Sequence, residues 1–300
     1  MDTRILITGG QSFLGAWTAR LLLEEGTPFL LLDPAPTNSV LAQVIDPEPL
    51  RSIPRVFGSL FDPLFLRRVI EERGITAAIH LAGIDDPTFR GSAERARRAR
   101  NEGLASLLEG AARSLGLAAA VVYASTDPSA QEEPARRAAA EQGVGSLGVR
   151  LPPAYGAGGE AGPCGAFTRA IRAAVLARRF TIPFSGAMEV AYVEDAARAL
   201  IAASREPRRE AAAWPLGGEA VEVAEFIRGI ETVLPEAAGK ISSAGEERSV
   251  EFALEESIDI ARSPFEDLSR TAFLEGIRRT AAIYRALAEE GRLQDAGDGS

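Results

Sequence analysis

Short apolar runs alternate with amphipathic stretches along the first half of the chain. Such short runs are typical of buried strands, and we expect strands at 4–8, 28–33, 55–58, 77–82, 119–125 and 147–151. Between them, apolar residues recur at helical spacing, which predicts helices at 13–25, 62–72, 93–114 and 134–141. Strands that alternate with helices form right-handed βαβ units. The pattern therefore predicts an α/β fold built on a doubly wound parallel sheet.

The pattern changes after Leu151. The segment 152–165 is rich in glycine and proline, which is typical of a loop, and short strands and helices follow it, with a closing helix at 273–290. We therefore predict one α/β domain over 1–151, to which the chain returns near 188–204. A smaller C-terminal α/β lobe is expected over 152–293. The polar residues 294–300 are expected to form a flexible tail.

Composition narrows the class of protein. The 300 residues carry a net charge of −9, and such an acidic chain is not suited to bind nucleic acid or an anionic membrane. No apolar run approaches the ~20 residues of a membrane span, and no signal peptide precedes the first strand, so we expect a cytoplasmic protein. The single cysteine, Cys164, and the single histidine, His80, argue against a disulfide within the chain and against a metal site. We interpret His80 as structural.

The stretch ILITGGQSFLG, residues 5–15, places paired glycines between the first strand and the first helix. A helix N-terminus at such a turn offers backbone N–H groups and partial positive charge to a pyrophosphate. Gly9 suits a tight turn, and Gly15 allows the helix to pack closely on the sheet. Asp33 ends the second strand, at about the separation from the turn where an acidic residue binds the adenosine ribose. Its charge repels a 2′-phosphate, which favours NAD over NADP; the alternative is that Asp33 only caps the strand before Pro34.

Six motifs in order resemble the NAD-dependent epimerase/dehydratase family of the extended short-chain dehydrogenase/reductases. They are TGGQSFLG (8–15), GSLFD (58–62), IHLAG (79–83), VVYAST (121–126), VRLPPAYGAGG (149–159) and AYVEDAARAL (191–200). The resemblance implies a Rossmann-like domain that binds NAD and a C-terminal lobe that binds a small-molecule substrate. The cofactor-binding residues that it implies are Gly9, Gly10, Ser12, Phe13, Leu14, Gly15, Asp33, Ser59, Leu60, Leu81, Ala82, Gly83 and Ser125.

The catalytic pattern of this family is incomplete here. The family uses a Ser or Thr followed by Tyr-x-x-x-Lys on a helix, and only Thr126 matches, at the Ser/Thr position. Glu133 and Arg137 would occupy the places of the tyrosine and the lysine; a surface ion pair between these two is the competing interpretation. Tyr155, in a segment that borders the cleft in the family, is a further acid/base candidate.

The short spacing between Thr126 and Arg150 predicts that the family's substrate loop and full-length helix are absent. That helix commonly forms the family's dimer interface, so the sequence leaves a homodimer open.

Three functions remain open from the sequence. The first is an NAD(P)-binding oxidoreductase or epimerase that acts on a small sugar, polyol or sugar nucleotide with non-standard acid/base residues. The second is a catalytically inactive dinucleotide sensor or partner subunit, which the absent tyrosine and lysine favour. The third is a scaffold whose nucleotide site is lost; Ser12 and Ser59, which depart from the family pattern, leave it open, and the glycine turn with Asp33 argues against it.

Overall fold

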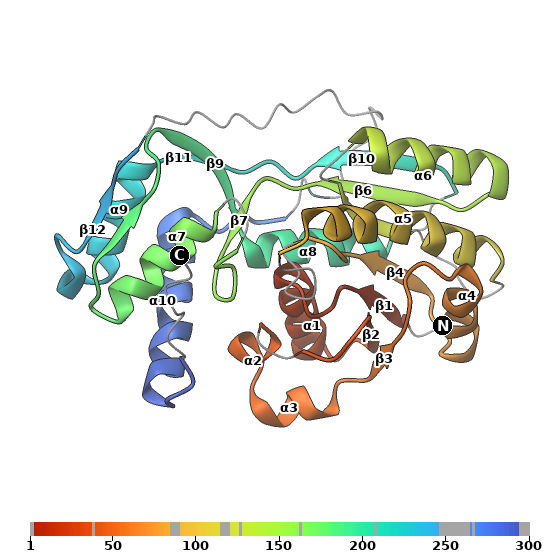
Figure 1. The fold of residues 1–300 in the computed structure, drawn as a ribbon, viewed down its shortest axis with the longest axis horizontal. Helices are drawn as coiled ribbons and strands as arrows, with labels where there is room; N and C mark the ends of the chain where they lie inside the picture. Colours follow the sequence, from red (N-terminus) through yellow and green to blue (C-terminus); the bar gives the residue numbers. More distant parts are fainter. Residues whose placement is uncertain are drawn as a thin grey trace. The chain divides into compact units, whose positions relative to one another are not determined.

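The computed structural model describes residues 3–37, 40–84, 91–114, 121–125, 128–161, 164–206, 209–245, 265 and 268–293. The chain divides into two compact units, drawn in Figure 1. The first is formed mainly by Met1–Leu151 and Glu194–Gly217, and the second mainly by Pro152–Val193 and segments after Gly218. Within the described residues, no helix combines the length and the apolar character needed to cross a membrane.

A parallel sheet of seven strands forms the centre of the first unit, in the order β10-β6-β5-β4-β1-β2-β3. The strands are β1 (Ile5–Thr8), β2 (Phe29–Asp33), β3 (Arg55–Phe57), β4 (Ala77–His80), β5 (Val121–Ser125), β6 (Ser146–Arg150) and β10 (Ala211–Pro215). The order reverses between β1 and β4, because β1 pairs with β2 on one side and with β4 on the other. This arrangement confirms the α/β class and the doubly wound parallel sheet.

Helices cover both faces of this sheet. They are α1 (Phe13–Glu25), α2 (Leu41–Val44), α3 (Pro47–Ser52), α4 (Pro63–Glu72), α5 (Ala93–Ala112), α6 (Pro128–Gln142) and α8 (Val193–Ser204). Helices α4, α5 and α6 pack in a row on one face, and α1 and α8 lie on the other (Figure 1). Because both faces are covered, β1, β2, β4 and β5 are buried along their whole length, which explains their continuous apolar runs.

Helix α6 differs from the sequence prediction. Pro134 was expected to start the helix, since proline is favoured in the first turn, but the helix begins at Pro128 and runs through Pro134. The extra turns are tied to the sheet: Gln131 Nε2 donates to the carbonyl oxygen of Ala124 at 3.2 Å. With 15 residues, α6 is longer than the predicted helix at 134–141. What is short is the connection from β5, residues 126–127, which lie outside the described residues.

The second unit is a smaller lobe with two sheets, ordered β11-β9-β7 and β12-β8. Its strands are β7 (Ala154–Tyr155), β8 (Phe180–Ile182), β9 (Ala187–Tyr192), β11 (Glu219–Glu222) and β12 (Ile241–Ser243). Its helices are α7 (Gly165–Val175), α9 (Val223–Val233), the 3-10 helix η2 (Pro235–Ala237) and α10 (Phe273–Glu289). Aromatic rings form the centre of its core, where Phe226 stacks on Phe167 with ring centroids 4.2 Å apart and meets Tyr155 edge-on. The expected tail, 294–300, lies outside the described residues.

His80 joins β1, β4 and α5 through its ring. Its Nε2 lies 3.0 Å from the carbonyl oxygen of Arg100, and its Nδ1 lies 2.7 Å from Thr8 Oγ1. A carbonyl oxygen can only accept, so Nε2 carries the proton and the Thr8 hydroxyl donates to Nδ1. Burial lowers the pKa of His80 to about 4, so the ring is neutral at physiological pH. The structural interpretation of this histidine agrees with these contacts.

We predict that this ring makes stability depend on pH. Because the folded chain excludes a proton that the unfolded chain binds below pH 6.5, the free energy of unfolding should fall as the pH drops from 6.5 toward about 4. The contribution of this single group is at most about 3 kcal/mol. Urea unfolding measures the loss, and a His80→Gln variant should lack that part of it. Since the chain has one histidine, imidazole NMR reports on it alone; a native titration midpoint near pH 6.5 would contradict the prediction.

Candidate functional site

The turn between β1 and α1 has no room for side chains at its glycines. Gly9 has φ 74°, and a Cβ atom there would lie 2.5 Å from the backbone nitrogen of Ala82. A Cβ atom at Gly15 would lie 2.2 Å from the carbonyl oxygen of Gly9, and one at Gly10 would lie 2.6 Å from the Leu31 side chain. The turn can therefore follow this path only with glycine at these positions.

Ser12 caps the first helix at the position of the family's second glycine. Its backbone is extended, with φ −70°, so this position does not need glycine. Its Oγ accepts a hydrogen bond from the backbone N–H of Gly15 at 3.1 Å. Within the described residues, the N–H groups of Phe13 and Leu14 have no acceptor, as expected in the first turn of a helix. These two donors, in the partial positive field of the helix end, suit a phosphate group.

The end of β4 borders the same turn. The backbone N–H of Leu81 donates to the carbonyl oxygen of Thr8 at 2.9 Å, and Ala82 lies against Gly9 as described above. Gly83 has φ 79° and contacts the backbone of α5 at Ala96. These contacts lie at the carboxyl ends of β1 and β4, where the strand order reverses, which is the usual ligand position in open α/β sheets.

Asp33 lies at the end of β2 and is 1% exposed. Its Oδ1 lies 3.4 Å from the backbone N–H of Gln11 in the glycine turn. The Gln11 side chain connects the turn to the segment after β2: its Nε2 donates to the Ala35 carbonyl at 2.7 Å, and its Oε1 accepts from the Thr37 N–H. Sequence reasoning did not select Gln11, because the sequence does not indicate which distant groups a glutamine side chain will contact.

A cavity of about 570 Å³ opens beside these residues. Pro34 and Ala35, residues 58–61 after β3, and two arginines of α5 line it. Two expected cofactor residues belong to this lining: Ser59, which is exposed, and Leu60, which is 3% exposed. The structure therefore places the glycine turn, Asp33 and the expected adenosine contacts along one edge of one unit.

The end of β5 carries a buried ionic cluster that sequence reasoning missed. Glu132 of α6 accepts two hydrogen bonds from Arg150, from Nε and Nη2 at 2.8 Å each, and one from Ser125 Oγ at 2.9 Å. Burial alone would raise the pKa of Glu132, but the hydrogen bonds from Arg150 and Ser125 outweigh it and hold the pKa below its ordinary value. Glu132 is thus a bound carboxylate rather than a proton donor. The sequence would have indicated this cluster only if the helix had been predicted to begin before Pro134, which places Glu132 on α6.

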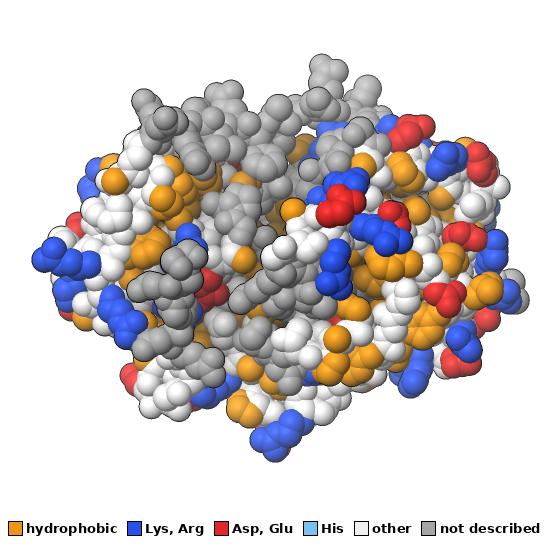
Figure 2. Space-filling view, viewed as in Figure 1, with side chains coloured by type: hydrophobic (Ala, Val, Ile, Leu, Met, Phe, Trp, Pro, Cys, Tyr) orange, Lys and Arg blue, Asp and Glu red, His pale blue; other side chains and the backbone are white. Residues whose placement is uncertain are grey.

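The catalytic candidates from the sequence are not brought together. Glu133 and Arg137 are both exposed on α6, and the ion partner of Glu133 is Arg136, at 2.8 Å, instead of the expected Arg137. Similar pairs recur along the surface helices, and Figure 2 shows acidic and basic side chains interspersed over this region. This position favours the surface interpretation of Glu133 and Arg137. Thr126 lies outside the described residues.

Tyr155 lies in the core of the second unit. Its hydroxyl donates to the carbonyl oxygen of Phe273 at 2.9 Å, and the side chain is 1% exposed. The other three tyrosines are also at least 98% buried, namely Tyr123, Tyr192 and Tyr284. Burial raises the pKa of Tyr284, with the nearby charge of Glu160 adding to the effect, and burial likewise raises that of Tyr123. Neither Tyr123 nor Tyr284 is therefore set up to release its proton near neutral pH.

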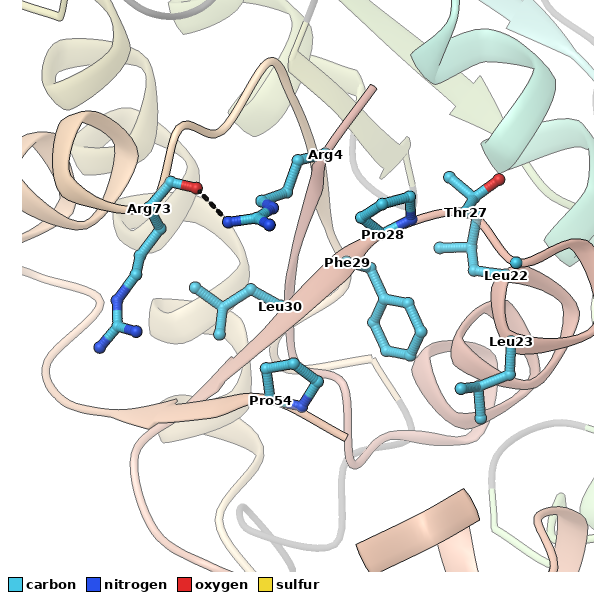
Figure 3. A pocket seen from close by; sticks show the side chains of 10 residues that line it. Arg4, Leu22, Leu23, Thr27, Pro28, Phe29, Leu30, Pro54 and Arg73 are labelled. Carbon is cyan, nitrogen blue, oxygen red and sulfur yellow. Dashed lines mark hydrogen bonds between the residues drawn. The ribbon is translucent and has the colours of Figure 1, made fainter. Parts of the chain in front are cut away.

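A second cavity of about 410 Å³ lies at the opposite edge of the first sheet. Figure 3 shows Phe29 of β2 on the side of Leu22 and Leu30 on the side of Arg4, whose guanidinium donates to the Arg73 carbonyl at 2.9 Å. Its walls come from residues that precede β1, β2 and β3, so it lies at the amino ends of the strands. Ligands of open α/β sheets bind at the carboxyl ends, so this cavity is not the dinucleotide candidate. In the described part of the chain, no group of His, Cys, Asp and Glu could hold a metal ion.

Comparison with known proteins gives relatives that match part of the chain. D-erythronate dehydrogenase of Cupriavidus necator is 35% identical over 127 residues, which are 41% of this chain and 38% of that protein. UDP-glucose 4-epimerase of Neisseria gonorrhoeae is 34% identical over 85 residues, which are 27% of this chain and 24% of that protein. The matched segments thus span less than two fifths of the length of these relatives.

Solved structures match nearly the whole chain in fold. UDP-glucose 4-epimerase of Thermotoga maritima, solved with UDP-glucose, has a TM-score of 0.68 at 18% identity, covering 95% of this chain and 100% of that one. The dTDP-glucose 4,6-dehydratase DesIV of Streptomyces venezuelae, solved with NAD and TYD, has a TM-score of 0.70 at 19% identity, covering 96% and 98%. Residues 5–134 match the family model described as "NAD dependent epimerase/dehydratase family". This matched segment is less than half of the chain, and it contains the glycine turn and its surroundings.

Proposed function

We propose that the protein binds NAD at the turn formed by residues 9–15. The observation that carries this proposal is the pair of free N–H groups, those of Phe13 and Leu14, on a turn with no space for side chains at Gly9 and Gly15. In this assignment the helix N-terminus holds the pyrophosphate and Asp33 accepts from the adenosine ribose. When bound, NAD supplies hydride acceptance, and NADH hydride donation. Several structures of like fold contain NAD, which supports the same cofactor here.

The geometry best supports a protein that binds this cofactor but does not carry out the proton transfer for which the family uses its tyrosine and lysine. The chain has no Tyr-x-x-x-Lys, its four tyrosines are buried, and α6 begins almost directly after β5. Where a catalytic helix would present a tyrosine, the Ser125 hydroxyl and Glu132 are held in the cluster with Arg150. We therefore favour a dinucleotide sensor or a partner subunit of another protein.

An oxidoreductase or epimerase is the second candidate, and one observation favours it: the two curated relatives are a dehydrogenase and an epimerase. Its substrate would be a small sugar, polyol or sugar nucleotide, with Thr126 as the hydroxyl that contacts it. A homodimer and a cytoplasmic location stay predictions from the sequence.

We expect Gly9→Ala to abolish NAD binding, because the added methyl group meets the Ala82 backbone at 2.5 Å and the residue must keep φ 74°. Calorimetric titration of the purified chain, after removal of any bound cofactor, measures the affinity. Gly26→Ala is the matched control: Gly26 also has a positive φ, but nothing lies within 4 Å of its Cβ position, so NAD affinity should persist. No binding of NAD or NADH to the wild-type protein at millimolar concentration would disprove the proposal.

The cluster at the end of β5 can be tested by stability. Glu132→Gln should lower the free energy of unfolding by roughly 3 kcal/mol, because it leaves the Arg150 charge buried without its carboxylate. The control is Glu133→Gln, one residue further along α6, which removes an exposed pair and should change stability by less than about 1 kcal/mol. Denaturant unfolding compares the two variants. Equal effects would show that Glu132 does not brace α6 against β6.

A further inference from the structure

The side chain of Gln11 forms two hydrogen bonds with the segment that follows β2. Its Nε2 donates to the carbonyl oxygen of Ala35 at 2.7 Å, and its Oε1 accepts from the backbone N–H of Thr37. A carbonyl oxygen can only accept and an N–H can only donate, so these two partners fix the orientation of the amide. Gln11 is 1% exposed, and both polar atoms of its side chain are used within the protein.

These two bonds continue the pairing of β1 with β2 beyond the ends of the strands. In a parallel ladder, the N–H and C=O of one residue bond to two residues that are two positions apart on the next strand. Ala35 and Thr37 are two positions apart, and the Gln11 amide bonds to them in the same pattern. The last paired residues of the two strands are Thr8 and Leu32. The amide therefore adds a ladder contact after the strands have ended.

The sequence of this segment, DPAPT at 33–37, allows two bonds to hold it. Pro34 and Pro36 have fixed φ angles and no backbone N–H, so the segment has few conformations to choose from. Ala35 is exposed and Thr37 is partly buried, so water can replace the Gln11 amide at both backbone groups. Loss of the two bonds should therefore free the segment without unfolding the chain.

Asp33 lies directly before this segment, as the last residue of β2. Its Oδ1 lies 3.4 Å from the backbone N–H of Gln11, which is long for a hydrogen bond. This contact alone is weak, whereas the two side-chain bonds of Gln11 hold the chain directly after the carboxylate. The same residue thus contacts Asp33 through its backbone and the following segment through its side chain.

We propose that Gln11 is a positioning residue, which holds Asp33 at a fixed separation from the glycine turn and so orders the site before a dinucleotide binds. This inference rests on the proposed function, in which the helix N-terminus holds the pyrophosphate and Asp33 accepts from the adenosine ribose. When these two contact points are held together in advance, binding does not have to order the chain between them. Gln11 acts through Asp33, and no proton or electron moves in this step.

Calorimetric titrations with NAD⁺ of the wild-type protein, Gln11→Met, Asp33→Ala and the double variant test the inference. Methionine is similar to glutamine in length and makes neither hydrogen bond, so Gln11→Met should weaken NAD⁺ binding about tenfold, as expected for two neutral hydrogen bonds. In the Asp33→Ala background the same change should weaken binding by no more than about twofold, because the group that Gln11 positions is gone. A merely structural role of Gln11 would give the full loss in both backgrounds.

Gln43→Met is the matched control, because Gln43 lies on α2 and its Oε1 has no hydrogen-bond partner within the described residues. It should leave NAD⁺ affinity unchanged. Gln11→Asn keeps the amide on a side chain that is one methylene group shorter; it serves if Gln11→Met does not fold, and it should weaken binding likewise. An unchanged or higher affinity of Gln11→Met, or an equal loss with and without Asp33, would overturn the inference alone. No binding of NAD⁺ by the wild-type protein would overturn the proposed function as well.

Discussion

The backbone at Gly9 lies so close to the end of β4 that one methyl group there would meet the amide of Ala82 at 2.5 Å. This approach depends on the parallel pairing of β1 with β4, in which Thr8 lies opposite His80. The His80 ring, fixed between Thr8 and the carbonyl of Arg100, extends the same contact to α5. The turn, the reversal of strand order and the packing of α5 therefore depend on the same set of contacts.

In the other half of the sheet, a buried ion pair fixes the position of a helix. Helix α6 follows β5 so closely that its second turn lies beside the strand ends, where Glu132 accepts from Arg150 and Ser125. A buried ion pair contributes little net stability compared with apolar packing, but it is costly to break, so it fixes the register of the helix. That position leaves Ser125 bound within the protein. The polar groups at this strand end therefore hold the helix on the sheet.

The sequence by itself indicated six strands of the first unit and its α1, α4 and α5 helices, because burial on two faces imposes continuous apolar strands and periodic helices, and α1 was predicted at its observed bounds. It did not indicate β10, which the fold brings beside β6 from the segment that the sequence assigned to the C-terminal lobe. It also indicated the glycine turn, since close backbone approach excludes every side chain at Gly9 and Gly15. It failed at α6, where Pro134 is a strong local signal for a helix start. Only the tertiary structure decided that helix, because the bonds of Gln131 and Glu132 to the sheet outweigh the local preference of proline. The tertiary structure also decided the partners of Gln11 and Glu133, since the contacts of a polar side chain depend on which segments the fold brings beside it.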